Sequence, residues 1–341
     1  MAKLEQPLKL TVIFKSISPL FIADATSGDS VVTNDGYIRN GKIPNTTPIT
    51  RTERKPALVT NQDGEEEIAY FPYIKANNIV GRLRRKVLEV VKEACREQGA
   101  TISSAVYRGV GCGASSGTPS GEQGTLSDYI KASEHPIIGL LGGGDSIYPS
   151  GVTMTDANPI HKSLIDAGAV SSELESLATA INPLRMTYPN SLVRRDPMSD
   201  FKDLSEADVV EGGVETVDLW HQQVNDSKNG DTRLMLKNIV AYETALTGLA
   251  YASEVTFRST THDHHVGLFL ECLSRLAQSN EMGGKVSKGL GRFNMTVLNG
   301  DDVILQSDNG NVKVHGGEAY FDAFSDAMEN FDVKELDSFF E

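Results

Sequence analysis

The sequence has few of the features that would mark a secreted, metal-bound or membrane protein. Its three cysteines, Cys95, Cys112 and Cys272, are odd in number and far apart, so they form neither a disulfide framework nor a zinc set. No apolar run approaches the roughly 18 residues that a membrane span requires. No basic and then apolar segment follows Met1. We therefore expect a cytoplasmic protein with reduced thiols and no membrane partner.

The composition indicates a folded core with many loops. Hydrophobic residues make up 39% and charged residues 23% of the 341 residues, which excludes a wholly disordered or collagen-like chain. The 31 glycines indicate many loops. The length suits two average domains or one elaborated domain.

The charges are unevenly distributed. The whole chain carries −14, yet residues 39–55, 75–96 and 285–292 carry +4, +5 and +3. These three stretches together carry +12, so the remaining residues carry −26. Such segregation favours a polyanion site on an acidic body, although a solvated helix face would explain any one stretch alone.

Hydrophobic spacing predicts the main secondary-structure elements. Apolar residues alternate over 8–14 and predict a strand, after which Pro19 forces a strand end, a bulge or a sheet edge. Residues 77–96 predict a helix with Asn77 or Asn78 as its N-cap. Further helices are expected near 171–181 and at 264–278, and further strands at 152–155, within 239–257, and at 292–298, 303–306 and 312–315.

These elements lack the repeated strand–helix alternation of a doubly wound sheet. We predict an α+β fold built on a split βαβ, ferredoxin-like sheet with long insertions. The insertions comprise a polar stretch at about 24–70, a flexible low-complexity loop at about 111–127 and a segment at about 184–237. Ten acids face two lysines within 196–231, and eight acids face one lysine in a partly helical C-terminal segment, 318–341.

The stretch from Gly283 to Phe293 contains four glycines, three cations and one serine. Successive exposed N–H groups beside Lys and Arg would form a phosphate cradle. A Walker A loop would end in Gly-Lys-Ser/Thr before a helix, whereas Gly289 is followed by Leu290 and a strand. A dinucleotide site needs a strand before it and a helix after it, which is the reverse order. A tight hairpin with incidental lysines remains the alternative.

Other polar clusters give weaker signals. We interpret 262–265, His-Asp-His-His, as a solvated helix start in preference to a metal pair, because no second cluster supplies the remaining ligands. The other histidines, His135, His161, His221 and His315, are isolated, which favours surface or packing roles. Three loop aspartates, Asp24, Asp29 and Asp35, would suit a divalent ion, but aspartate is also common in turns. We predict no catalytic residue, metal or cofactor.

Four ordered motifs resemble the RAMP superfamily of CRISPR proteins. They are Ser-Pro-Leu-Phe-Ile at 18–22, Ala-Asn-Asn-Ile-Val-Gly-Arg-Leu-Arg-Arg at 76–85, Ile-Gly-Leu-Leu-Gly at 138–142 followed by Val-Thr-Met-Thr-Asp-Ala at 152–157, and the Gly-rich loop at 283–293. The resemblance spans residues 8–298 and is nearest to the backbone ("Cas seven") branch, in particular that of type IV effector complexes. Val80 stands where the family often has Lys, so Lys75 or Arg84 would supply that charge.

This resemblance implies a modified RRM-like palm over residues 1–317, with a finger at 24–70 and a thumb-like insertion at 184–237. It also implies a non-catalytic subunit of an antiviral ribonucleoprotein. Such a subunit binds CRISPR RNA and assembles with copies of itself in a helical filament, with other effector subunits and with a target nucleic acid, which we take to be DNA.

From the resemblance and the charge pattern we expect RNA contacts from two main regions and two weaker ones. Phosphate contacts suit a subunit that must accept any guide sequence. The expected RNA-binding residues are Lys75, Asn77, Asn78, Arg84, Arg85, Lys285, Ser287 and Lys288, with Arg51, Arg54, Arg194 and Arg195 at the finger and thumb edges. The alternatives are a RAMP-type endoribonuclease, which cuts target RNA with a loop aspartate or processes the guide, and a phosphate-binding metabolic domain.

Overall fold

The computed structural model describes residues 3–24, 30–32, 38–40, 47–60, 64–113, 125–143, 148–194, 209, 211–215 and 238–340, with the backbone alone at 30–32, 38–40, 47–48, 191–194 and 238–240. The chain divides into two compact units. Unit 1 comprises Met1–Ala23, Thr52–Thr187 and Ala245–Glu341, and unit 2 comprises Asp24–Arg51 and Tyr188–Thr244.

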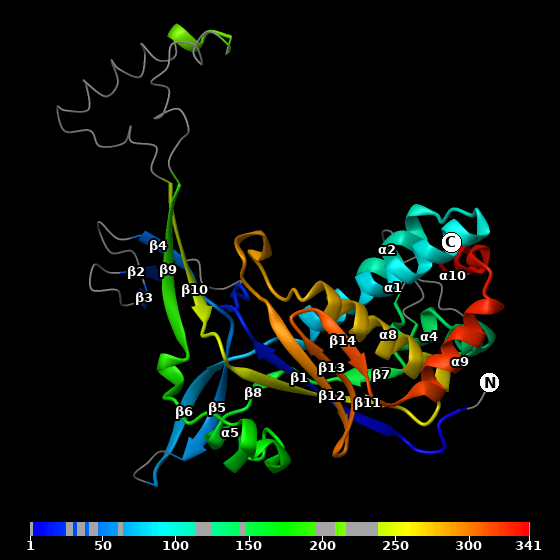
Figure 1. The fold of residues 1–341 in the computed structure, drawn as a ribbon, viewed down its shortest axis with the longest axis horizontal. Coiled ribbons are helices and arrows are strands. Elements are labelled where there is room, and N and C mark those ends of the chain that lie inside the picture. Colours follow the sequence, from blue (N-terminus) through cyan, green and yellow to red (C-terminus); the bar gives the residue numbers. More distant parts are fainter. Residues whose placement is uncertain are drawn as a thin grey trace. The chain divides into compact units, whose positions relative to one another are not determined.

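An antiparallel sheet forms the centre of unit 1 (Figure 1). Among the described residues its strands follow the order β14-β13-β12-β1-β11-β7, with β8 also paired to β11, and every pair is antiparallel. The strands are β1 (Leu8–Ser16), β7 (Val152–Met154), β8 (Asn158–Pro159), β11 (Ala250–Phe257), β12 (Phe293–Asn299), β13 (Asp302–Asp308) and β14 (Asn311–Val314).

Two amphipathic helices complete the core of unit 1. α1 (Ala76–Gln98) buries Ile79, Leu83 and Val87, and α8 (Asp263–Ser279) packs against it and against β12–β14. α9 (Glu318–Glu329) packs on α8. Along the chain, β1, α1, β7, β11, α8 and β12 follow the order strand, helix, strand, strand, helix, strand. The predicted α+β class is confirmed.

Shorter elements surround this core in unit 1. A two-stranded ribbon consists of β5 (Arg54–Thr60) and β6 (Glu66–Pro72). The remaining helices and 3₁₀ turns are α2 (Ser104–Cys112), α3 (Leu126–Glu134), α4 (Ile138–Leu141), α5 (Lys162–Asp166), η1 (Ser172–Leu177), η2 (Pro183–Arg185), η5 (Val286–Lys288), η6 (Val333–Leu336) and α10 (Asp337–Phe340).

Unit 2 contains a sheet of its own. Its described strands follow the order β3-β2-β4-β10-β9, in which β4 and β10 run parallel and the β2 pairs are antiparallel. They are β2 (Ser30–Val32), β3 (Ile38–Asn40), β4 (Thr47–Thr50), β9 (Thr187–Arg194) and β10 (Asn238–Ala245).

Most of the predicted elements of the core are confirmed. The helices expected at 77–96 and 264–278 are α1 and α8, and the strands expected at 8–14, 292–298 and 303–306 are β1, β12 and β13. The helix expected near 171–181 was wrong in length and type, since only the 3₁₀ turn η1 forms there. The flexible loop expected at 111–127 was wrong at both ends, since residues 111 and 112 belong to α2 and 126 and 127 to α3, while 114–124 lie outside the described residues. Within the described part of the chain, no helix is long and apolar enough to cross a bilayer.

Candidate nucleic-acid interface

The Gly-rich loop, residues 283–292, is hydrogen-bonded to the segment that follows β1. The Gly284 N–H donates to the Phe21 oxygen and the Gly291 N–H to the Pro19 oxygen, each at 2.8 Å. The Arg292 N–H donates to the Ser18 hydroxyl oxygen, also at 2.8 Å. The loop therefore takes one fixed position beside the end of the first strand.

Two of the loop glycines are required by close packing. Gly291 has φ +79°, and a Cβ there would lie 1.8 Å from the main-chain oxygen of Met282. Gly283 has φ +75°, and a Cβ there would lie 2.4 Å from the oxygen of Phe21. An L side chain rarely adopts such a φ, and neither site has room for one. These glycines are explained by the fold itself.

The main-chain donors of the loop are partly used inside the protein. Besides Gly284 and Gly291, the Lys288 and Gly289 N–H groups donate to Lys285 and Val286 in the 3₁₀ turn η5. The sequence predicted a run of exposed N–H groups, and for these four positions and for Arg292, which donates to Ser18, that expectation was wrong. Side chains are therefore the main groups that the loop offers to a phosphate.

Three polar side chains project from this turn. Ser287 and Lys288 are exposed, and Lys285 is half-buried with its ammonium 5.3 Å from the centre of the Phe21 ring. Burial lowers the pKa of Lys285, and the neighbouring Lys288 lowers it further. An anion that approaches these two ammonium groups would offset their repulsion and so favour their charged forms.

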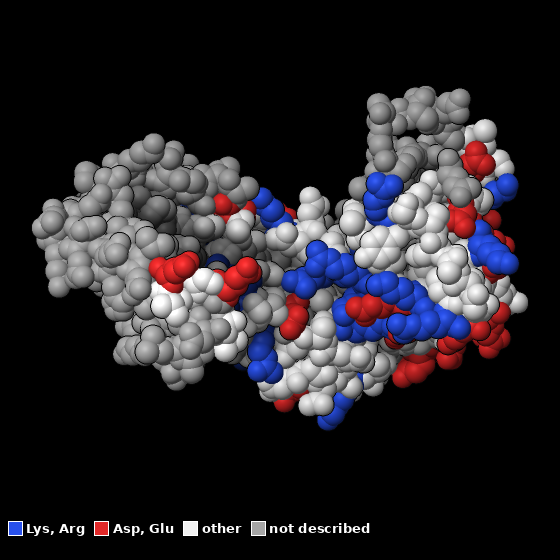
Figure 2. All heavy atoms as spheres, turned by 90° about the horizontal axis from the view of Figure 1, so that it is seen from above, with Lys and Arg blue, Asp and Glu red and all other residues white. Residues whose placement is uncertain are grey.

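Arg82 links the loop to α1. Its Nη2 donates to the Gly283 oxygen at 2.8 Å, so the first turns of α1 and the Gly-rich loop lie against each other in unit 1. Burial, and then the neighbouring Arg85, lower the pKa of Arg82. Figure 2 shows Lys and Arg side chains gathered in a band, with a few acidic ones among them, over the part of unit 1 where Figure 1 places α1.

The exposed side of the α1 start carries three of the expected residues, Asn77, Asn78 and Arg85. Gly81 lies among them, and a Cβ at this position would meet nothing within 4 Å. Glycine in a helix interior costs roughly 1 kcal/mol relative to alanine. The protein's own packing does not require this glycine, which leaves the surface of α1 open to close approach at this point.

The N-terminus of α1 is not capped as the sequence predicted. Lys75 occupies the N-cap position and makes no capping side-chain bond, so the assignment of Asn77 or Asn78 was wrong. Asp156 performs this task from beyond β7: its Oδ1 accepts from the Ala76 N–H at 3.0 Å, and its Oδ2 lies 2.9 Å from the Lys55 ammonium. The residues around the start of α1 could not predict this cap, because Asp156 is 80 positions away from Ala76 in the sequence.

Lys75 and Arg84 are both engaged within unit 1. The Lys75 ammonium lies 2.8 Å from Glu53 Oε1, although 44% of the side chain stays exposed. The Arg84 guanidinium donates to the main-chain oxygens of Leu141 at 2.7 Å and Gly142 at 3.0 Å, and burial lowers its pKa. Arg84 thus holds the α4 segment against α1.

The finger and thumb candidates are divided between the two units. Arg51 belongs to unit 2, where its Nε lies 3.8 Å from the buried carboxylate of Glu243. Arg54 belongs to unit 1 and donates to the Thr187 hydroxyl. Arg194 ends β9 with only its backbone described, and Arg195 lies outside the described residues.

The histidine cluster, defined as His135, His262, His264 and His265, is buried in unit 1. The exposed fractions are 6%, 6%, 1% and 0%, so the expected solvated helix start was wrong, and His135 is not isolated. His264 Nε2 lies 3.1 Å from His265 Nε2, which lies 3.0 Å from the His135 oxygen. The aromatic rings of Phe331 and Phe339 cover His135, which explains how the acidic C-terminal segment packs on the core.

The described residues contain no group of three or more His, Cys, Asp or Glu arranged to hold a metal ion. Of the three loop aspartates, Asp24 begins unit 2 with its N–H bonded to the Arg51 oxygen at 2.9 Å. Asp29 and Asp35 lie outside the described residues, as does His221. Sequence reasoning missed Arg82 and Phe21 as parts of the interface; Arg82 could have been found from its place one residue after Gly81.

Comparisons with known proteins gave a structural likeness only. No protein-family model and no curated protein matches the sequence. The fold is similar to that of a chain in a solved structure described as "Type IV-B CRISPR Complex", with a TM-score of 0.50 and 15% sequence identity. The similarity covers 86% of this chain and 92% of that chain. At this identity the likeness shows a shared fold.

Proposed function

We propose that this chain is an RNA-binding backbone subunit of a CRISPR effector complex, with an RRM-like palm and no catalytic role. The observation that carries this proposal is the Arg82–Gly283 hydrogen bond. It joins two cationic motifs, far apart in the sequence, on one surface of a fold shared with a chain of a type IV-B CRISPR complex.

The proposed RNA contacts are of two kinds. Lys285, Ser287 and Lys288 would bind phosphate from the loop, and Asn77, Asn78 and Arg85 from the exposed side of α1. Arg82, Arg84 and Lys75 would instead hold that surface in shape, because their side chains contact Gly283, the α4 segment and Glu53. Contacts to phosphate position a strand without reading its bases, as a subunit that accepts any guide requires.

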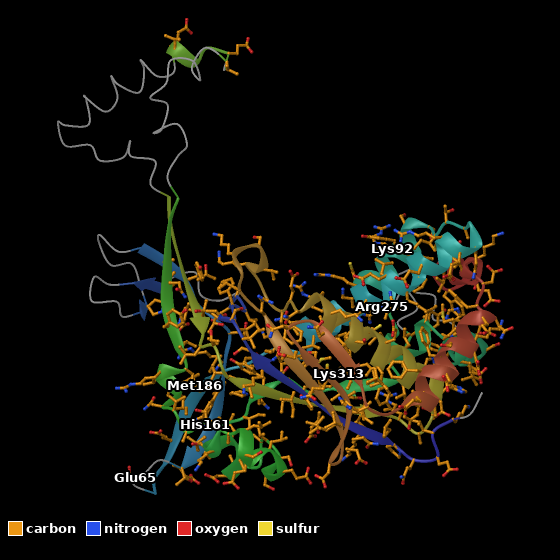
Figure 3. The ribbon with its side chains drawn as sticks, in the orientation of Figure 1. Glu65, Lys92, His161, Met186, Arg275 and Lys313 are labelled. Atoms are coloured by element: carbon orange, nitrogen blue, oxygen red, sulfur yellow. The ribbon has the colours of Figure 1, made fainter. Side chains whose placement is uncertain are left out.

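The test is RNA binding by a charge-reversed loop. The full-length protein is purified, and any RNA that accompanies it is sequenced. The double variant Lys285→Glu, Lys288→Glu is then compared with Lys313→Glu, Lys334→Glu, which makes the same charge change at exposed positions on β14 and η6. Figure 3 labels Lys313.

We expect the loop variant to lose affinity for all single-stranded RNA sequences equally. The slope of log affinity against log salt should fall by roughly 0.7 for each lost phosphate contact. The control variant should bind as the parent does. Equal binding by both variants, or a loss confined to one RNA sequence, would contradict the proposal, and metal-dependent cleavage of bound RNA would favour the endoribonuclease.

The assembly part of the proposal is supported by an exposed apolar face. On the outer face of the β5–β6 ribbon, Leu58 pairs with Ile68 and Pro56 with Tyr70. Leu58, Ile68 and Tyr70 are 58%, 64% and 50% exposed. Contiguous exposed apolar side chains are typical of protein interfaces. We therefore place a contact with another copy, or with another effector subunit, on this ribbon.

A head-to-tail contact between copies whose rotation does not close a ring generates an open helical assembly. The number of copies in it would be set by the length of the bound RNA. The double variant Leu58→Ser, Ile68→Ser should shorten the assemblies that form on a long RNA, as measured by light scattering, while a short RNA is bound as before. Assemblies of unchanged size would place the contact elsewhere, and a strictly monomeric parent protein on long RNA would refute assembly itself.

A further inference from the structure

The polar stripe on α1 continues far beyond the candidate interface. Positions 78, 82, 85, 89, 92 and 96 recur at intervals of three and four, so they share one face of the helix. The residues are Asn78, Arg82, Arg85, Glu89, Lys92 and Arg96. At 1.5 Å per residue, the stripe runs about 16 Å from Arg85 to Arg96. It therefore leads from the Gly-rich loop toward the far end of α1.

The acids near this stripe are neutralised by other cations of the protein. The Lys86 ammonium lies 2.9 Å from Glu89 Oε1, and Arg275 of α8, labelled in Figure 3, binds Glu93 through two bonds of 2.7 Å. The bonds from Arg275 hold the pKa of Glu93 below its usual range. In the described part of the chain, Arg85, Lys92 and Arg96 form no ion pair within 4 Å.

An exposed aromatic ring lies beside the far part of the stripe. α2 packs against α1, and its N-cap Ser103 accepts a bond from the Val106 N–H, which fixes the start of the helix. Tyr107 of α2 is 48% exposed, and the Lys92 ammonium lies 5.7 Å from the centre of its ring. Arg108 is exposed next to it. A flat ring among cations is the usual platform for stacking a base of a single strand.

We propose that Lys92, Arg96 and Tyr107 form a second contact site for a single-stranded nucleic acid, which passes along α1 from the Gly-rich loop. This inference rests on the proposed function for the strand's first contact at the loop. Lys92 and Arg96 bind phosphates, and a base stacks on the open face of Tyr107. The occupant is the guide RNA itself, as it continues from the loop.

A nucleic acid fits this site better than an acidic protein surface does. The cations alone would suit both, but the half-exposed Tyr107 ring gives a stacking surface that a carboxylate-rich partner has no need of. The chain as a whole carries −14, so three cations on one helix face that form no ion pair within 4 Å in the described part of the chain are a local exception to its charge.

The experiment compares short and long single-stranded RNA on the full chain. The short RNA is limited to the length that saturates the loop site, and the long one extends beyond it. The variants are Lys92→Glu with Arg96→Glu, Tyr107→Ala, Tyr107→Phe, and the control Lys313→Glu with Lys334→Glu. Each variant is first shown to have the parent's thermal stability.

We expect the charge-reversed and Tyr107→Ala variants to bind short RNA as the parent does and long RNA roughly tenfold more weakly. For the Lys92→Glu, Arg96→Glu variant, the slope of log affinity for long RNA against log salt should fall by roughly 1.4, because two phosphate contacts are lost. Tyr107→Phe, which keeps the ring, should bind like the parent. A loss that appears only after a complementary strand is added to the bound guide would assign the site to the second strand and would overturn the guide as its occupant.

The inference is also overturned if these variants bind long single-stranded RNA like the parent. A loss of binding to an acidic partner subunit, with all nucleic-acid affinities unchanged, would assign the site to a protein and overturn it as well. Failure of the proposed function is seen separately, because the loop variant Lys285→Glu, Lys288→Glu would then bind short RNA as well as the parent.

Discussion

The guanidinium of Arg82 donates a 2.8 Å hydrogen bond to the main-chain oxygen of Gly283, a residue 201 positions away in the sequence. The bond fixes the second turn of α1 against the start of the Gly-rich loop. The loop is also bonded to Pro19 and Phe21, so three separated segments meet at this point. The relationship explains how cations of two sequence stretches can face one strand.

Replacing Arg82 by Ala should therefore weaken both the fold and RNA binding. A hydrogen bond from a charged donor contributes roughly 1.5–3 kcal/mol, and its loss leaves the Gly283 oxygen without that donor. Urea unfolding and RNA affinity measure the two effects. Arg85→Ala serves as the control, because Arg85 is exposed and its loss should lower RNA affinity with little change in stability. A stable Arg82→Ala protein with full RNA affinity would contradict this role.

Two glycines of the loop provide a matched pair. Gly289 and Gly291 have nearly equal φ angles, +78° and +79°, but a Cβ on Gly289 would meet open space and one on Gly291 would lie 1.8 Å from the Met282 oxygen. Gly289→Ala should cost roughly 1–2 kcal/mol of unfolding free energy through the backbone alone. Gly291→Ala should cost clearly more and displace the loop. Similar losses in denaturant unfolding would show that the contact with Met282 is not decisive.

Gly81→Ala should change stability and RNA binding in opposite directions. Alanine favours the helix by roughly 1 kcal/mol over glycine, and its Cβ meets no protein atom within 4 Å. We expect a higher melting temperature without RNA and a lower affinity for RNA, because the added methyl group blocks close approach of the strand. A stabilised protein with unchanged affinity would show that no ligand approaches Gly81.

Asp156→Ala should destabilise the N-terminus of α1. Burial alone would raise the pKa of Asp156, but the Ala76 N–H and the Lys55 ammonium outweigh it and lower the pKa. Loss of a helix cap costs roughly 0.5–2 kcal/mol. Asp156→Asn keeps an oxygen that accepts the bond and should lose less. Hydrogen exchange at the first turn of α1 measures the effect, and equal losses in both variants would attribute it to the charge.

The histidine cluster should make the protein acid-sensitive. Burial, and then neighbouring histidines, lower the pKa of His135 and His264 to about 4 and that of His265 to about 3, against an ordinary value of 6.5. Below pH 6.5 the unfolded chain binds protons that the folded chain does not. The free energy of unfolding should therefore be level above this pH and fall as the pH drops toward 4.

Each of these histidines contributes up to about 1.4 kcal/mol per pH unit. Urea unfolding between about pH 7 and pH 5 measures the slope. His315→Gln, at an exposed position, should leave the slope unchanged, and His264→Gln should reduce it. A parent protein whose stability is the same across this range would contradict the assignment.

The order of residues alone was enough to predict the main elements. Alternation gave β1 and β12, helical spacing gave α1 and α8, and glycine content marked the loop between α8 and β12. These are local properties, in which each residue's neighbours along the chain determine its conformation. The concentration of cations in α1 and the loop could be read in the same way.

The partners of those side chains were decided by tertiary packing. Arg82 contacts Gly283, Asp156 caps α1, and Arg84 holds the oxygens of α4, each across a long stretch of chain. The histidines at 262–265 were wrongly expected in solvent because the residues packed around them are distant in sequence, as His135 is, whose main-chain oxygen lies 3.0 Å from His265 Nε2. The spacing of apolar residues shows which side of a helix or strand is buried. Only the packing of the whole chain determines which other segment covers that side, and therefore which cationic side chains are exposed to a ligand.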